Sequence, residues 1–342
     1  MTLSRRIAVL MICAPLALSC FANGAVAAPG APPHIRHFFV IVLENENGEV
    51  TFGAEPPAPY LAKTLKAAGT YLPNYFGTGH HSLDNYLSMV SGQPPNELTQ
   101  GDCPVFLEMK PGTLGRDGVA HGQGCVFPGR VKTVVNQLEQ KGIGWRGYMQ
   151  DEASAVSEGI PATCRHPAIG APDNAFVATA TDQYATRHDP FVYFHSIIDH
   201  PTCQRNVVDL AHLTRDLRRE SATPAYSFIT PDLCADGHDA ACPDPSQPGG
   251  FAGIEAFLRE WVPRIRASPA YRDRGAILIT FDESETGAES CCGEKSGPNT
   301  TNNGDGVEDD FGLTHLAEAA KPGVKPFGSD VFNRTDCPPR RR

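Results

Sequence analysis

The chain has 342 residues and carries 29 lysines and arginines against 39 aspartates and glutamates, so its formal net charge is −10 at pH 7. An acidic chain without a long basic run is a poor ligand for a phosphate backbone, which argues against nucleic-acid binding. The length is enough for one large domain with a sizeable hydrophobic core.

The first 28 residues have the pattern of a signal peptide. Two arginines precede an apolar stretch at residues 7–18, and Ala25-Val26-Ala27 offers a small-residue cleavage site. The apolar stretch is shorter than the roughly 20 residues that a spanning helix needs, although an uncleaved anchor is the alternative. We therefore expect an exported protein, periplasmic or secreted, with a single domain at residues 29–342 and no stable membrane insertion.

Strands and helices are expected to alternate along the rest of the chain. Continuous apolar runs predict buried strands, and apolar residues at helical spacing predict helices. In chain order the expected elements are strand 38–43, helix 60–68, helix 82–92, helix 133–141, strand 144–149, strand 226–229, helix 251–266 and strand 276–281. This alternation predicts an α/β fold with a largely parallel central sheet and helices on both faces.

The cysteines are expected to form disulfide bonds, because an exported protein meets an oxidising compartment. Cys13 and Cys20 lie in the signal segment, so nine of the 11 cysteines remain. Local spacing predicts three pairs, which are Cys103 with Cys125, Cys164 with Cys203, and Cys234 with Cys242. Since no CxxC pair is present, the cysteines indicate loop staples and not a zinc ribbon.

Polar clusters follow the expected strands at their carboxyl ends, where α/β folds place their sites. The first strand ends in Glu44 and Asn45, and the last ends in Asp282 and Glu283. Carboxylates in this position could bind a divalent cation, since hard cations prefer oxygen ligands. The alternative is that they are solvated residues at the ends of strands.

A glycine-rich turn, Gly77-Thr78-Gly79, delivers His80, His81 and Ser82 to the start of an expected helix. Ser82 could be a nucleophile, because a helix N-terminus favours an anion and a metal or a base can activate the hydroxyl. The same serine could instead cap the helix. The two histidines offer an acid, a base or a metal ligand.

Further polar residues lie in loops that could reach the same place. Asp232 follows the expected strand 226–229, and His238 and Asp239 lie inside the loop of the third expected disulfide. His188 comes just before an aromatic segment. These residues could line a site, or they could be incidental surface residues.

Taken together, these segments resemble the bacterial phosphoesterases that include secreted acid phosphatases and phospholipases C, within the alkaline-phosphatase-like superfamily. The resemblance covers nearly all of the mature chain. The segments that carry it are 40–45, 79–86, 187–191, 231–232, 238–239, 280–283, 307–313 and 326–328.

The resemblance implies an alkaline-phosphatase-like sandwich and a phosphoryl-transfer reaction at a metal centre. By this analogy, Glu44, Asp282 and Glu283 bind a divalent metal, which could be Ca, Mg, Mn or Fe. Ser82 attacks phosphorus, and Asn45 holds a phosphoryl oxygen.

The resemblance also implies roles for the remaining polar residues. The candidates for orienting the phosphate or protonating the leaving group are His80, His81 and His238. The other candidates for substrate contact are Asp232, Asp239 and His188. The expected substrates are phosphomonoesters, as for an acid phosphatase, and the alternative is a phospholipase C-type phosphodiesterase that acts on a phospholipid headgroup.

One departure from the family pattern lies near the end of the chain. In the pattern a further loop, a core strand and an Asn-His-Tyr segment precede the helix that begins here at Val307, but Gly304-Asp305-Gly306 leads almost directly into it. Two other hypotheses follow. The chain could be an inactive, truncated member of the fold that acts as a binding protein, or an extracellular protein stapled by disulfides whose polar clusters are incidental.

Overall fold

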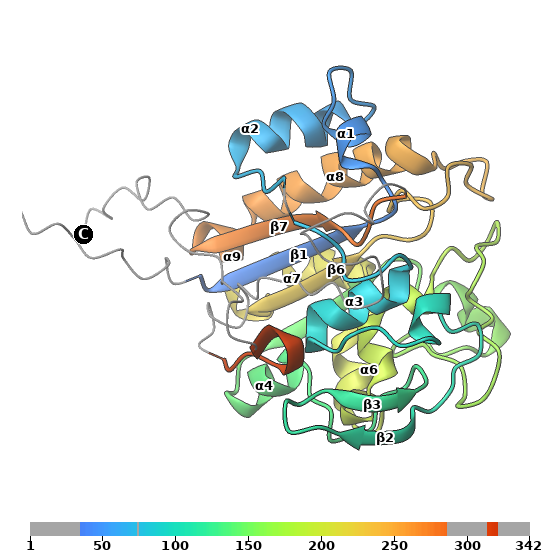
Figure 1. Cartoon of the computed structure of the whole chain (residues 1–342). Coiled ribbons are helices and arrows are strands. Elements are labelled where there is room, and N and C mark those ends of the chain that lie inside the picture. The colour runs from blue at the N-terminus through green and yellow to red at the C-terminus, as the bar shows by residue number, and fades with distance from the viewer. Residues whose placement is uncertain (1–34, 74, 286–312, 321–342) are drawn as a thin grey trace, which may run out of the picture. The chain divides into compact units, whose positions relative to one another are not determined.

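The computed structural model describes residues 35–73, 75–285 and 313–320 (Figure 1). Within them, five strands form one parallel sheet in the order β5-β4-β6-β1-β7. The strands are β1 (His37–Leu43), β4 (Trp145–Met149), β5 (Val207–Asp209), β6 (Tyr226–Thr230) and β7 (Gly275–Phe281). The predicted α/β fold and its parallel sheet are therefore confirmed.

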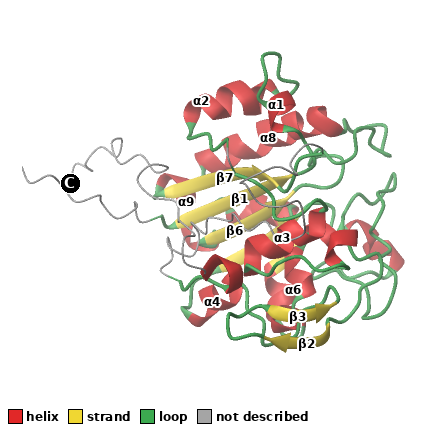
Figure 2. Cartoon of the chain, viewed as in Figure 1, coloured by secondary structure: helices red, strands yellow, loops and turns green. Residues whose placement is uncertain are grey.

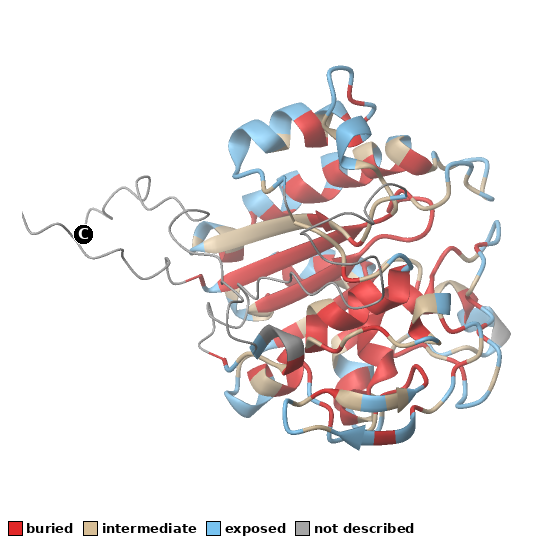
Figure 3. Cartoon of the chain, viewed as in Figure 1, coloured by how far each residue is buried: buried red, intermediate tan, exposed pale blue. Residues whose placement is uncertain are grey.

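The strand β1 lies inside the sheet and pairs with β6 on one side and β7 on the other. All seven of its residues are buried, as expected of a parallel strand that is covered on both faces (Figure 3). The strand β7 pairs with β1 alone among the described residues, and most of its side chains are only partly buried. The carboxyl ends of these neighbouring strands bring Glu44 and Asp282 to the same end of the sheet.

Helices cover both faces of the sheet, as predicted (Figure 2). On one face, α3 (Ser82–Ser91) and α4 (Val134–Gln140) pack with Phe38 and Val40 of β1 in one hydrophobic cluster. On the other face, α8 (Gly250–Ala267) packs in a second cluster with the alternate β1 residues Phe39 and Ile41. Because successive side chains of a strand point to opposite faces, one apolar run serves both cores.

The remaining helices are short. They are α1 (Gly48–Thr51), η1 (Tyr60–Leu65) with its continuation α2 (Lys66–Ala68), η2 (Thr99–Gly101), η3 (Ser154–Glu158), η4 (Thr186–His188), η5 (Pro190–Tyr193), α5 (His195–Ile198), α6 (Thr202–Asn206), α7 (Ala211–Asp216), η6 (Glu220–Ala222), α9 (Pro269–Arg272) and η8 (Ala317–Ala320). An antiparallel hairpin, β2 (Lys110–Leu114) with β3 (Ala120–Gln123), forms a separate small sheet. All four predicted helices are present within a residue or two of their expected bounds.

Three disulfide bonds staple the loops, and all three were predicted. They join Cys103 to Cys125, Cys164 to Cys203, and Cys234 to Cys242. Among the described helices, none has the length and apolar character of a membrane span. The predicted signal peptide and the departure after Gly304 lie outside the described residues.

Candidate active site

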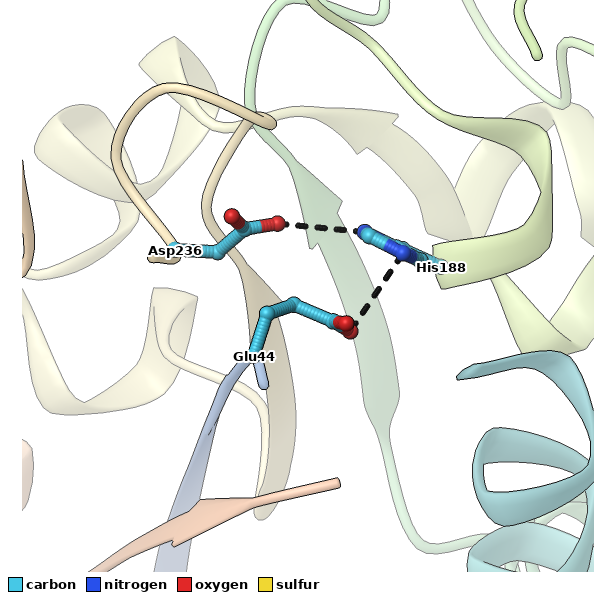
Figure 4. A group of neighbouring side chains, drawn as sticks. All are labelled: Glu44, His188 and Asp236. Carbon is cyan, nitrogen blue, oxygen red and sulfur yellow. Dashed lines mark hydrogen bonds and ion pairs between the residues drawn. The ribbon is translucent and has the colours of Figure 1, made fainter. Parts of the chain in front are cut away.

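Glu44 is the centre of a buried polar cluster at the carboxyl end of β1. Its side chain is completely buried, and Oε2 accepts a hydrogen bond of 2.8 Å from Ser82 Oγ. Its other oxygen, Oε1, lies 3.3 Å from His188 Nε2, and Nδ1 of the same ring lies 3.1 Å from Asp236 Oδ2. Figure 4 shows Glu44, His188 and Asp236 pointing toward one another from three separate segments.

Ser82 is the first residue of α3, and His81 is its N-cap residue. The Ser82 hydroxyl points to Glu44 and not to a backbone N–H of its own helix. Asp102 takes over part of the capping, because its Oδ1 accepts a 2.9 Å hydrogen bond from the N–H of Leu83. The alternative that Ser82 merely caps the helix is therefore wrong.

The side chain of Asn85 shapes the turn that precedes Ser82. Its Oδ1 accepts hydrogen bonds from the N–H groups of Thr78 and Gly79, at 2.6 and 3.1 Å, and its Nδ2 donates to the carbonyl of His81 at 2.8 Å. The sequence analysis missed this role of Asn85. An asparagine three residues into a helix that follows a glycine-rich turn is the signal that could have revealed it, because such a side chain can satisfy turn N–H groups.

Asp282 follows β7 and lies beside Glu44. Its Oδ1 accepts a hydrogen bond of 3.3 Å from the N–H of Asn45, and its own N–H donates to Leu43. Asn45 adopts a left-handed backbone conformation with φ of 57°, which asparagine tolerates better than most residues. Glu283 points elsewhere, with Oε2 lying 2.7 Å from His80 Nδ1. The structure thus brings Asp282 to Glu44 and pairs Glu283 with a histidine.

His80 and His81 flank the site on its exposed side. Their side chains are 68% and 56% exposed, whereas Ser82 is 3% exposed. Nδ1 of His81 lies 3.7 Å from Asp102 Oδ2, so in both rings Nδ1 faces a carboxylate. This arrangement leaves the Nε2 atoms to meet solvent or a ligand.

Burial and crowding of charge perturb every titratable group in the centre of the cluster. Burial raises the pKa of Glu44 well above its usual range, and the neighbouring charges of Asp282 and Asp236 raise it further. Burial likewise raises the pKa of Asp236 well above its usual range and that of Asp282 to about 6. Burial lowers the pKa of His188 well below its usual range. Such opposed shifts at a strand end are typical of functional sites.

The donor set fits a divalent cation. Glu44, His188 and Asp236 each offer one ligand atom, and these atoms lie within 4.8 Å of one another. Glu44, His188 and Asp282 each have one buried atom without a hydrogen-bond partner among the described residues, namely Oε1, Nε2 and Oδ2 respectively. Two or three carboxylates with one imidazole suit Mn, Fe or Zn as well as harder ions. A positive charge here would offset the burial and the mutual repulsion that raise the pKa values of the acids.

Asp236 is the main residue of the cluster that the sequence analysis missed. Its backbone carbonyl accepts a hydrogen bond of 2.9 Å from the N–H of Glu44, so this hydrogen bond ties the loop after β6 to the end of β1. Gly237 permits this approach, since its φ is +115° and an added Cβ would lie 2.8 Å from the carbonyl oxygen of Glu44. An acid beside a glycine inside a short disulfide loop is the signal that could have identified it.

His238 lies next to this loop glycine and has partners on both ring nitrogens. A nitrogen of Arg187 lies 3.0 Å from His238 Nε2, and Asp239 Oδ1 lies 2.7 Å from Nδ1. Because arginine can only donate, Nε2 accepts and Nδ1 donates to Asp239, which assigns the neutral tautomer. Asp232 stabilises the same loop, because its Oδ1 accepts hydrogen bonds from the N–H groups of Cys234 and Ala235.

Comparisons with known proteins find relatives that are named as acid phosphatases. The chain is 25% identical over 251 residues to the probable acid phosphatase of Kluyveromyces lactis, covering 73% of this chain and 48% of the relative. It is 24% identical over 304 residues to the acid phosphatase of Aspergillus fumigatus, covering 88% of this chain and 57% of the relative. It is 27% identical over 226 residues to the phosphate-repressible acid phosphatase of Penicillium chrysogenum, covering 66% of this chain and 43% of the relative.

This chain therefore spans about half the length of the curated relatives that it matches. The match to the Phosphoesterase family extends over residues 55–289, which include Ser82, His188, Asp236 and Asp282. The resemblance inferred from the motifs is confirmed. The chain belongs to the Phosphoesterase family.

Proposed function

We propose that this protein is an exported, metal-dependent phosphatase that hydrolyses phosphomonoesters with Ser82 as the nucleophile. The observation that carries the proposal is the 2.8 Å hydrogen bond from Ser82 Oγ to the buried carboxylate of Glu44. Membership of the Phosphoesterase family supports the reaction class, and the three relatives named as acid phosphatases favour monoesters. Three disulfide bonds support export to an oxidising compartment.

In the proposed first step, Ser82 Oγ attacks phosphorus. The bond from Oγ to phosphorus forms as the bond from phosphorus to the ester oxygen breaks, and the serine proton passes to Glu44 Oε2, which already accepts its hydrogen bond. His80 and His81, which flank Ser82, can protonate the departing alcohol through Nε2.

In the second step, water attacks the phosphoserine and releases inorganic phosphate. The bond from the water oxygen to phosphorus forms as the bond from phosphorus to Oγ breaks. A water proton passes to the histidine that protonated the alcohol, and Oγ recovers a proton from Glu44. A divalent cation bound by Glu44 Oε1, His188 and Asp236 would supply positive charge that stabilises the anionic phosphoryl oxygens in both steps. The two oxygens of Glu44 thus have separate tasks, one toward the cation and one toward Ser82.

The test is hydrolysis of p-nitrophenyl phosphate by the mature protein, residues 29–342, scanned over pH and over divalent metals. Ser82→Ala should lower kcat by at least about a hundredfold, because it removes a group that bonds to phosphorus. Ser157→Ala is the matched control, since Ser157 is exposed and is not one of the residues of the cluster. Full activity in Ser82→Ala would exclude the serine as the nucleophile.

Two further results of this assay would favour other functions. Faster turnover of bis(p-nitrophenyl) phosphate than of the monoester would favour a phosphodiesterase of the phospholipase C type. A folded, monodisperse protein that hydrolyses neither ester with any metal would support the hypothesis of an inactive member that acts as a binding protein.

A further inference from the structure

A cavity of about 1630 Å³ lies at the amino ends of the strands, and so at the opposite end of the sheet from Glu44 and Ser82. Its wall includes Ile35, Trp145 and Ala225, which lie at or just before the starts of β1, β4 and β6. No residue of the candidate active site lines it. Any ligand in this cavity is therefore separate from the phosphoryl-transfer chemistry proposed above.

The wall of the cavity is strongly basic, although the whole chain is acidic. Its charged residues are Arg36, Arg146, Arg205, Arg218, Arg219, Glu139 and Glu220. The wall thus has five arginines and two glutamates, whereas the whole chain has a net charge of −10. A local excess of this sign concentrates anions, since charges that line a concave surface reinforce one another.

Two of the arginines already have carboxylate partners. Arg36 pairs with Asp273 and, at 3.2 Å, with Glu220, and Arg146 pairs with Asp216. These three ion pairs fix two of the five arginines of the wall. The remaining positive charge is not neutralised by them.

Arg205, Arg218 and Arg219 are exposed, and among the described residues none of their guanidinium groups forms an ion pair. Glu139, the other acid of the wall, is engaged by hydrogen bonds from Trp145 Nε1 and Thr202 Oγ1. Three exposed arginines thus line one cavity, and none of them has an ion-pair partner among the described residues. Each presents a planar fork that matches two oxygens of a phosphate.

We propose that this cavity is a second anion site, which binds small condensed phosphates. Its volume exceeds the roughly 300–1,000 Å³ of ordinary small-molecule pockets, which favours a chain of phosphate groups over a single one. Three arginines, each able to bind two phosphate oxygens, also suit an anion that carries several phosphate groups. The inference does not depend on the proposed function, since it uses other residues at the other end of the sheet.

The test is calorimetric titration of the mature protein with tripolyphosphate and, separately, with orthophosphate, at fixed ionic strength. All samples carry Ser82→Ala, so that turnover does not contribute heat. Arg218→Ala with Arg219→Ala should weaken tripolyphosphate binding at least tenfold. The matched control, Arg116→Ala with Lys63→Ala, removes two exposed positive charges elsewhere and should change the affinity less than twofold.

Tripolyphosphate should bind more tightly than orthophosphate to the parent protein. Arg218→Lys with Arg219→Lys keeps the charge but loses the planar guanidinium groups, so its affinity for tripolyphosphate should lie between those of the parent and the alanine variant. It also provides the comparison if the alanine variant does not fold. An equal loss in the control variant, unchanged binding in the alanine variant, or binding of anionic vesicles without binding of tripolyphosphate would each overturn the proposal.

Discussion

Gly79 offers a sharp test of how the turn before Ser82 is built. A Cβ at this position would lie 2.2 Å from Asp84 Oδ2 and 2.6 Å from both Cγ and Oδ1, far inside van der Waals contact. Asp84 is only 1% exposed, so its carboxyl group cannot move to solvent without opening the core. We predict that Gly79→Ala lowers the free energy of unfolding by about 1–3 kcal/mol, the usual cost of overpacking a buried site.

A double-mutant cycle identifies the cause. In Asp84→Ala the carboxyl group is gone, so Gly79→Ala should then cost little, and the coupling between the two changes should be about 1–2 kcal/mol. Denaturant unfolding at pH 5 measures all four proteins while Asp84 is protonated, because burial raises its pKa to about 8. Gly101→Ala is the control, since a Cβ there meets nothing within 4 Å. A Gly79→Ala variant as stable as Gly101→Ala, or a cost that Asp84→Ala leaves unchanged, would refute the packing described.

Three further predictions concern pH, metal binding and the loop after β6. Because burial raises the pKa of Asp84 to about 8, the folded protein keeps a proton that the unfolded chain loses above about pH 4, so stability falls by up to about 1.4 kcal/mol per pH unit over that window. Asp84→Asn should reduce the observed slope by this contribution in denaturant titrations at several pH values, and an unchanged slope would contradict the assignment. Asp236→Asn should weaken divalent-metal binding about 10- to 100-fold by calorimetry, because it removes the carboxylate that faces His188, and wild-type affinity would speak against the proposed ligand set. Cys234→Ala with Cys242→Ala should lower the free energy of unfolding by about 2–3 kcal/mol, as expected for a short closed loop, and an unchanged melting temperature would argue against the bond.

The parts of the fold that follow from local patterns were predictable from the sequence. The strands β1 and β7 are continuous apolar runs, and the helix α3 shows helical spacing of Leu83, Tyr86 and Leu87. The disulfide pairs followed from short separations along the chain. For the strands and the helix the signal lies within a few residues, so no knowledge of distant contacts was needed.

Elements that depend on distant partners were not predicted. The strand β5 has three residues and exists because it pairs with β4. The hairpin of β2 and β3 contains Lys110-Pro111-Gly112 and Ala120–Gln123, whose polar and small residues give no alternating apolar pattern. Short strands of this kind are stabilised by their neighbours more than by their own composition.

The candidate site was predictable as a set of residue types at strand ends, but its detailed grouping was not. Glu44 and Ser82 come together as expected, yet the compact ligand group joins Glu44 to His188 and Asp236. This grouping depends on a loop folding back onto the end of β1, which no local pattern reveals. Glu283 lies next to Asp282 in sequence but points to a histidine, because successive residues after a strand diverge.

If Ser82 is the nucleophile, it becomes phosphorylated during turnover. The most direct measurement is to quench the mature protein with acid during hydrolysis of p-nitrophenyl phosphate and to map the modified peptide by mass spectrometry. We predict one phosphoryl group on Ser82, absent from Ser82→Ala and from samples without ester. Steady hydrolysis with no phosphoryl group on Ser82, or the same hydrolysis by Ser82→Ala, would contradict it.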